Sequence, residues 1–331
     1  MVIPTTYAAS LFLLFLSLVC FSIWPNLYKL CGSGWRFELF SLDFALGALL
    51  AALAAAYTLG TLGPNDSFSD RMLIAGRAAS AWIIGAGGIL TLGNTVFLAS
   101  VVLLGLSAAT LLTFGTALAL TAFLHFRVPH LALVFSGGVL FLLSVAFAVG
   151  AGKFRMPGKP KTRWSYRKGI ALAVLAGIAF GLFQSVMSPA TDPDSGPGPY
   201  AALLMLSIGL LLFTPMLDFF FLNIKITGDP ISFRYYARGT AKQHALGFIA
   251  GLVWAIGALG LLLPLAAAGR SAPKPALSFT LPALAVLVCV LLGVAGWKEF
   301  SSSPQTAKTR LAAGAAFFAA GVMLFGLGLT R

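Results

Sequence analysis

The chain has 331 residues, of which 59% are hydrophobic and only 9% are charged, and its mean hydropathy is +0.95. Soluble domains carry roughly 25% charged residues because their surface must stay in water, so this composition excludes a soluble globular protein. The net charge of +13 comes from Lys and Arg between apolar stretches, where anionic lipid explains it, and we expect no nucleic-acid partner.

Ten apolar segments follow one another along the chain, each close to the roughly 20 residues that a helix needs to cross a bilayer. We therefore predict an all-α integral membrane protein with ten transmembrane helices in the lipid bilayer. The least certain boundary separates the third and fourth segments, because only Gly105-Leu106 divides them. The predicted spans are residues 5–28, 39–62, 80–104, 107–126, 131–151, 169–190, 199–223, 244–267, 278–297 and 309–329.

The distribution of basic residues between these spans predicts the orientation. If the N-terminus is outside, sixteen of the 22 Lys and Arg residues fall in inner loops and six fall outside. Cytoplasmic loops carry an excess of Lys and Arg. We therefore expect a multi-pass protein of the cytoplasmic (inner) membrane, with both termini outside and the basic central loop inside.

The central loop divides the chain into two groups of five spans. An odd number of spans per half gives the halves opposite orientations, which is the arrangement of an inverted repeat. Two short matches support it: Phe21–Asn26 aligns with Phe180–Ser185, and Gly87 and Gly93 align with Gly251 and Gly257. We predict two inverted five-helix repeats around a central cavity, with residues 1–152 as the first repeat, 153–168 as a basic cytoplasmic linker and 169–331 as the second repeat.

Two acidic residues, Asp43 and Asp218, lie within apolar segments, each one to two turns from the predicted cytoplasmic end. A charged group in a span is costly, so such residues are candidates for a role in coupling or gating. The alternative is that both reach the interface or pair with a nearby base, such as Arg36 or Lys225.

Polar and aromatic side chains deeper in the spans are candidates for binding a solute. Amide side chains offer one acceptor and two donors, which suits a ligand with amide or urea edges. The alternative is hydrogen bonding between helices or, for threonine, to the carbonyl of its own helix. Pro25 is expected to interrupt its helix beside polar groups, a pattern typical of transporter sites. The candidate substrate-binding residues are Trp24, Asn26, Asn94, Thr113, Gln184 and Trp254.

The sequence contains no motif of an enzyme or of a metal site. It lacks HExxH, a phosphate-binding Walker loop and a Ser/His/Asp set, and its three histidines lie at the ends of spans. Its three cysteines are unclustered, so we interpret them as packing residues. We expect a protein that is not an enzyme and needs no cofactor, and any transport should be gradient-driven or facilitative.

Several short motifs follow one another in the first half of the chain. They are Ile23-Trp24-Pro25, Ser41-Leu42-Asp43-Phe44, Thr58-Leu59-Gly60 with Gly63-Pro64, Gly87–Asn94 and Gly105-Leu106-Ser107. In these motifs the chain resembles the ureide permease family of the drug/metabolite transporter superfamily, nearly continuously over residues 20–125 and more loosely after 169. The resemblance implies a ten-helix transporter of allantoin, uracil and related ring ureides, with Trp24, Asp43 and Asn94 at family motif positions.

The functional prediction is secondary transport of a small uncharged polar ring solute, such as a ureide, hydantoin or nucleobase, with proton coupling as one option. The chain departs from the family at Ala108-Ala109, where an acid is usual, and at Gly257–Leu261, where polar residues are usual. Three alternatives therefore stay open: a sugar carrier, a carrier of lipophilic metabolites, and a membrane scaffold that does not transport. The sequence identifies neither the solute nor an oligomeric partner.

Overall fold

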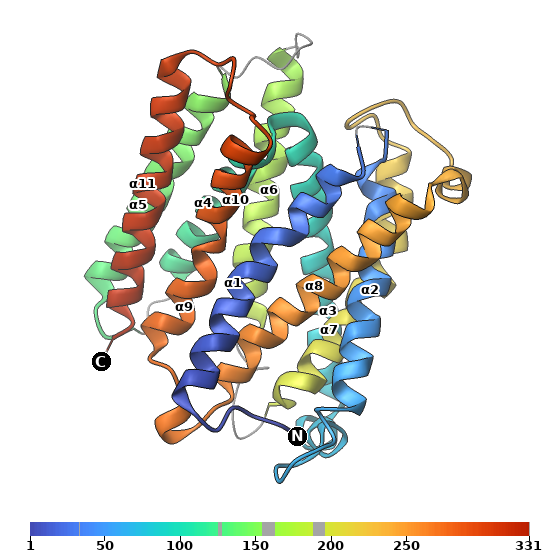
Figure 1. Ribbon diagram of the computed structural model, residues 1–331, viewed down its shortest axis with the longest axis vertical. Helices are drawn as coiled ribbons and strands as arrows, with labels where there is room; N and C mark the ends of the chain where they lie inside the picture. The colour runs from blue at the N-terminus through green and yellow to red at the C-terminus, as the bar shows by residue number, and fades with distance from the viewer. Residues whose placement is uncertain (33, 125–127, 154–162, 188–195, 331) are drawn as a thin grey trace. The chain divides into compact units, whose positions relative to one another are not determined.

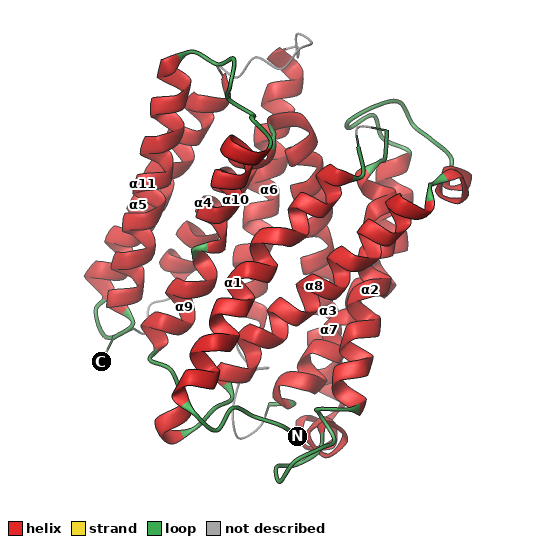
Figure 2. Ribbon diagram, viewed as in Figure 1, coloured by secondary structure: helices red, strands yellow, loops and turns green. Residues whose placement is uncertain are grey.

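The computed structural model describes residues 1–32, 34–124, 128–153, 163–187 and 196–330, and within them every regular element is helical (Figure 2). Ten helical segments are long and apolar enough to cross a membrane, and each overlaps one predicted span. The all-α, multi-pass membrane architecture is therefore confirmed. The spanning helices are α1 (Tyr7–Leu30), α2 (Phe37–Tyr57), α3 (Phe68–Leu104), α4 (Leu106–Leu124), α5 (Leu131–Lys153), α6 (Arg163–Met187), α7 (Gly198–Leu222), α8 (Ala241–Leu265), α9 with α10 (Pro275–Ala283 and Ala285–Leu291) and α11 (Gln305–Gly328).

Three features of the helices refine or correct the predictions made from the hydropathy pattern. Gly105, with a left-handed φ of 87°, is the single residue between α3 and α4, so the shortest predicted boundary is real. Helix α3 begins at Phe68 rather than near residue 80, because a more polar first piece precedes a kink at Gly76 (φ 73°). The predicted interruption at Pro25 is wrong, since α1 continues through this residue to Leu30.

The chain forms two compact units that each draw on both halves of the sequence. Unit 1 comprises Met1–Thr91 and Val186–Lys274, and unit 2 comprises Leu92–Ser185 and Pro275–Arg331. The division falls within α3. These compact units are a different division of the chain from the two sequence repeats, whose boundaries stay a prediction.

In unit 1, α8 lies alongside α1 and α2 (Figure 1), and glycines allow the close approach. A Cβ atom added to Gly251 would lie 2.0 Å from the carbonyl oxygen of Phe44 on α2, and one added to Gly47 would lie 2.0 Å from that of Phe248 on α8. Helix α7 packs against α2 and, through Gly209, against Gly87 of α3. Lipid offers no hydrophobic drive for helix association, so such small residues let backbones gain dispersion contacts instead.

In unit 2, α11 and α5 run side by side (Figure 1), and α5 also contacts α4. Gly137 of α5 and Gly321 of α11 face one another's backbone. The ninth span is divided: α9 and α10 are separated at Leu284, two residues after Pro282, and a π-helical turn, η4 (Leu292–Gly296), follows. Proline lacks the N–H that a continuous helix needs, which accounts for a discontinuity in this span.

Candidate functional site

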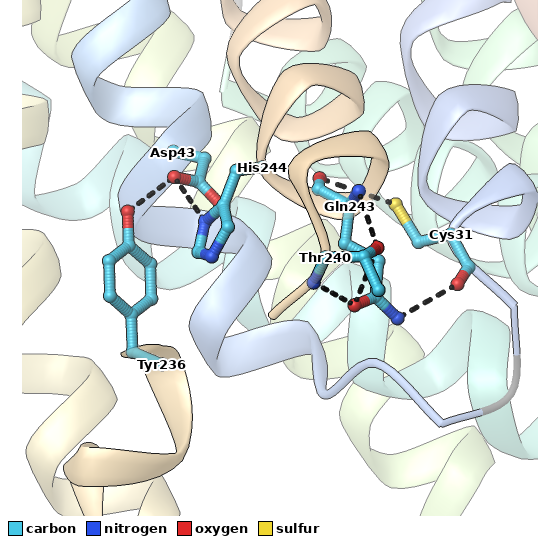
Figure 3. A network of polar contacts seen from close by, with 6 residues as sticks. All are labelled: Cys31, Asp43, Tyr236, Thr240, Gln243 and His244. Carbon is cyan, nitrogen blue, oxygen red and sulfur yellow. Dashed lines mark hydrogen bonds and ion pairs between the residues drawn. The ribbon is translucent and has the colours of Figure 1, made fainter. Parts of the chain in front are cut away.

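The buried carboxylate of Asp43 on α2 is held by two side chains from distant parts of unit 1 (Figure 3). The hydroxyl of Tyr236 donates a hydrogen bond to Oδ1 of Asp43. Nδ1 of His244, 201 positions later in the chain than Asp43, lies 2.9 Å from Oδ2 and 3.2 Å from Oδ1. Asp43, Tyr236 and His244 are called the acid network below, and they form a connected set of titratable groups at one end of α2 and α8.

The acid network is placed by the segment that connects α7 to α8. Tyr236 belongs to the 3-10 helix η2 (Phe233–Arg238), and His244 lies in the first turn of α8. The Tyr236 and His244 rings meet edge to face with centroids 4.5 Å apart, and Trp35 contacts the His244 ring edge-on at 5.1 Å. A Cβ on Gly239 would clash with Trp35 and His244, so a glycine is needed for this packing.

The start of α8 is fixed by a second set of contacts in Figure 3. Thr240 and Gln243 form a capping box, which satisfies two backbone N–H groups of the first turn. The Gln243 amide also donates to the Cys31 carbonyl oxygen at 3.3 Å. The Cys31 thiol lies beyond the end of α1, and burial, together with the nearby charge of Asp43, raises its pKa to about 12. Burial and the hydrogen bond to Asp43 likewise raise the pKa of the Tyr236 phenol above its ordinary range.

A cluster of three aromatic rings begins at the residue after Asp43. The Phe44 ring lies 5.2 Å from the Trp24 ring of α1 and 5.8 Å from the Trp254 ring of α8, measured between centroids. Both tryptophans are buried, and Trp254 lies near the middle of its helix. Trp24, Phe44 and Trp254 are called the aromatic cluster below, and the cluster brings two of the predicted substrate residues together.

Neither of the two acids pairs with the base suggested from sequence. Arg36 makes a two-pronged salt bridge with the buried Glu38, with a shortest N–O distance of 2.6 Å, and donates to the Asp229 carbonyl oxygen. Lys225 pairs with the Asp229 carboxylate at 2.6 Å. Asp218 is 1% exposed, and neither of its carboxylate oxygens has a hydrogen-bond partner among the described residues.

Two other predicted site residues lie in unexpected surroundings. The half-buried Asn26 amide donates to the Ser22 carbonyl oxygen of its own helix at 2.8 Å, an interaction that ties it to α1. Gln184 is exposed and lies three residues before Met187, the last described residue of α6, so its position near the middle of a span stays a prediction. The hydropathy pattern had extended the span to residue 190, part of which lies outside the described residues.

Unit 2 holds the remaining predicted residues, Asn94 on α3 and Thr113 on α4. Asn94 is 6% exposed and Thr113 is fully buried. Nδ2 of Asn94 and Oγ1 of Thr113 have no hydrogen-bond partner in the part of the chain that the structure describes. A buried polar atom without a partner costs about 1–3 kcal/mol. Such atoms call for an explanation, and water or a bound molecule would supply one.

In unit 2, the buried carboxylate of Glu299 stabilises the turn between α3 and α4. Glu299 accepts hydrogen bonds from the backbone N–H groups of Leu106 and Ser107, at 2.7 and 2.9 Å, and from the Ser107 hydroxyl at 2.9 Å. A negative charge at a helix N-terminus satisfies unpaired N–H groups and interacts favourably with the helix dipole. Glu299 thus fixes the beginning of α4.

Sequence reasoning missed His244, Tyr236 and Glu299. A signal did exist for His244, because the predicted topology places it at the same membrane face as Asp43. Tyr236 and Glu299 lie outside the apolar segments, so a search for polar groups within spans does not reach them. Their roles depend on chain segments that only the folded structure brings together.

Comparisons with known proteins inform the fold and not the function. No protein-family model and no curated protein matches the chain. A solved crystal structure that carries no functional description is similar over 96% of both chains, with a TM-score of 0.58 and 14% sequence identity. At this identity, the similarity shows that the fold occurs in a known structure.

Proposed function

We propose that the protein is a secondary transporter of a small uncharged polar ring solute of the ureide, hydantoin or nucleobase type, with Asp43 as a coupling or gating residue. The observation that carries the proposal is the direct succession of Asp43 and Phe44 on α2. One residue belongs to the acid network and the next to the aromatic cluster. A proton-responsive group and a wall for a flat ring are thereby adjacent on one helix.

The acid network has the chemistry of a gate. Protonation of Asp43 removes the charge that attracts His244 and the acceptor strength that holds Tyr236. Arg36, at the start of α2, holds the segment between α7 and α8 at a second point, because it donates a hydrogen bond to the Asp229 carbonyl oxygen. Loss of the Asp43 contacts would therefore release η2 while the Arg36 contact persists, which is a local opening rather than unfolding.

The solute class is supported by the groups that lack partners. Aromatic faces favour planar ligands, and binding sites combine apolar walls with a few polar groups that fix orientation. In unit 1, the aromatic cluster has the first feature. In unit 2, considered by itself, the amide nitrogen of Asn94 and the hydroxyl oxygen of Thr113 have no partner among the described residues, and a cyclic urea carries groups that could pair with them.

Membership of the ureide permease family is part of this proposal. Trp24, Asp43 and Asn94, the three residues at family motif positions, are all buried. The acid expected after the Gly105-Leu106-Ser107 turn is missing from that stretch, but Glu299 brings a carboxylate to the same turn from elsewhere in the chain. The absence of an acid at Ala108-Ala109 therefore counts less against membership of the family.

We further infer that the two halves of the chain are inverted repeats. The sequence match aligns Phe21 with Phe180 and Gly257 with Gly93. In unit 1, a Cβ on Gly257 would lie 3.2 Å from the Phe21 ring, and in unit 2, a Cβ on Gly93 would lie 2.9 Å from the Phe180 ring. The same glycine–phenylalanine contact thus recurs between α8 and α1 and between α3 and α6. Two repeats of five spans each place both termini on the same side of the cytoplasmic membrane. The excess of basic residues in the other set of loops supports the outer side for both termini.

Uptake by the purified protein in liposomes tests the function. The panel contains allantoin, hydantoin, uracil, a pentose, a hexose and a lipophilic amine, each measured with and without an inward proton gradient. Accumulation of a ring ureide or nucleobase is expected. Uptake of the sugars alone or the amine alone would favour the corresponding carrier instead. Binding and transport of none of them would favour the scaffold.

The Asp43→Asn variant tests coupling within the same assay. It preserves side-chain shape and removes the titrating group, so gradient-driven accumulation should fail while downhill exchange persists. Asp229→Asn is the matched control, because Asp229 lies in the same connecting segment, is 81% exposed and should tolerate the change. Accumulation by Asp43→Asn at the wild-type level would exclude a coupling role.

A further inference from the structure

Asp218 is a buried acid that lies outside the acid network and, unlike Glu38 and Glu299, has no partner among the described residues. It lies on α7, five residues before Asn223 caps the helix, and its side chain is almost completely buried. Both carboxylate oxygens lack hydrogen-bond partners among the described residues, and the nearby Thr214 hydroxyl donates to the Leu210 carbonyl oxygen instead. Asp43, at 4% exposure, is buried to a similar degree but has two partners.

In the part of the chain that the structure describes, no positive group is paired with Asp218. Among the described residues, the charged group that interacts electrostatically with Asp218 is Glu38 on the neighbouring α2. Glu38 is also an acid, so it repels a charged Asp218, and it forms a salt bridge with Arg36. On α8, which also contacts α7, His244 is committed to Asp43. An ionised carboxylate that is buried without partners is strongly destabilised, and such a group normally becomes neutral instead.

We propose that Asp218 is a proton-binding site, distinct from the gate at Asp43. The carboxylate binds one proton to give the neutral acid and releases one proton when its surroundings become hydrated or a positive group approaches. As a coupling site it rests on the proposed transport function, whereas proton binding as such does not. The two acids then have different roles: Asp218 carries the coupled proton, and Asp43, through its own protonation, releases the segment that controls access.

Infrared spectroscopy of the protein in lipid membranes tests proton binding directly. A protonated carboxyl group in an apolar site gives a carbonyl stretch that is separate from the amide bands and shifts in heavy water. This band should be present in the wild type at about pH 7 and absent from Asp218→Asn. Asp43→Asn is the matched control and should retain the band. A band that persists in Asp218→Asn would overturn the proposal.

A second measurement needs no variant. Dicyclohexylcarbodiimide reacts with protonated carboxyl groups in apolar surroundings, and mass spectrometry locates the adduct. Asp218 should be modified at about pH 7 and less so as the pH rises, whereas the exposed Asp229 should not be modified. No adduct on Asp218 at any pH at which the protein stays folded would contradict the proposal.

Transport separates this proposal from the proposed function. If the wild type accumulates a solute and Asp218→Asn only exchanges it, the coupling role is supported. If Asp218→Asn accumulates the solute normally, the coupling role fails. If the wild type transports nothing, the proposed function fails, and the spectroscopic band alone decides whether Asp218 binds a proton.

Discussion

The contact between α2 and α8 gives the sharpest test of how unit 1 is held together. In the Gly251→Ala variant, the new methyl group would lie 2.0 Å from the Phe44 carbonyl oxygen and 2.6 Å from the Ala48 amide nitrogen. An ordinary contact begins at 3.4 Å, so the two helices must separate by about 1.4 Å at this point. Both obstacles are backbone atoms, which cannot move by changing a rotamer.

The separation has two energetic consequences. Overpacking of this kind costs about 1–3 kcal/mol. The bond between His244 and Asp43 lies on the same pair of helices, about two turns from Gly251 along α8 and one residue from Phe44 along α2. At 2.9 Å it has little room to lengthen before it is lost. A hydrogen bond to a charged group contributes about 1.5–3 kcal/mol. We therefore expect Gly251→Ala to lower the free energy of unfolding by about 2.5–6 kcal/mol.

Unfolding of the purified protein in mixed micelles, followed by tryptophan fluorescence, measures this change. Gly85→Ala is the matched control, because a Cβ at this helical glycine meets nothing within 4 Å. It should stabilise the protein by about 0.5–1 kcal/mol through the lower chain entropy of alanine. A Gly251→Ala variant within about 0.5 kcal/mol of the wild type would refute the close approach of α2 and α8.

Three further predictions address other parts of the chain. Glu299→Ala should lower the melting temperature more than Glu299→Gln, because glutamine retains one acceptor for the N–H groups at the start of α4; equal effects would exclude the capping role. At about pH 8, Cys31 should resist maleimide, because a pKa of about 12 leaves very little thiolate; rapid labelling of the folded protein would contradict its burial. Because the native thiols are buried, Asp66→Cys and Ser302→Cys report topology. An impermeant reagent should label the first from outside and miss the second, and the reverse pattern would invert the proposed orientation.

Local sequence determined the helices of this protein. Whether a segment of about 20 residues is apolar enough to cross a membrane depends only on its own side chains, so all ten spanning segments were predicted. The same reasoning flagged Asp43 and Asp218, since a charge within an apolar segment is conspicuous wherever the segment packs. It failed at Pro25, because a proline near a helix end can be accommodated, and whether it breaks the helix depends on the neighbouring helices.

Only the tertiary structure decided the partners. The sequence offered Arg36, seven residues earlier, as an alternative partner for Asp43. In the structure Asp43 instead pairs with His244 and Tyr236, about 200 positions away, and Arg36 pairs with Glu38. Asp218 has no hydrogen-bond partner in the described part of the chain. These outcomes depend on which helix faces meet and how closely, and those in turn depend on glycines such as Gly247, whose missing side chain lets α8 lie directly against Asp43. The sequence shows which charged groups lie in apolar segments, and the packing of distant segments determines which partners, if any, stabilise those charges.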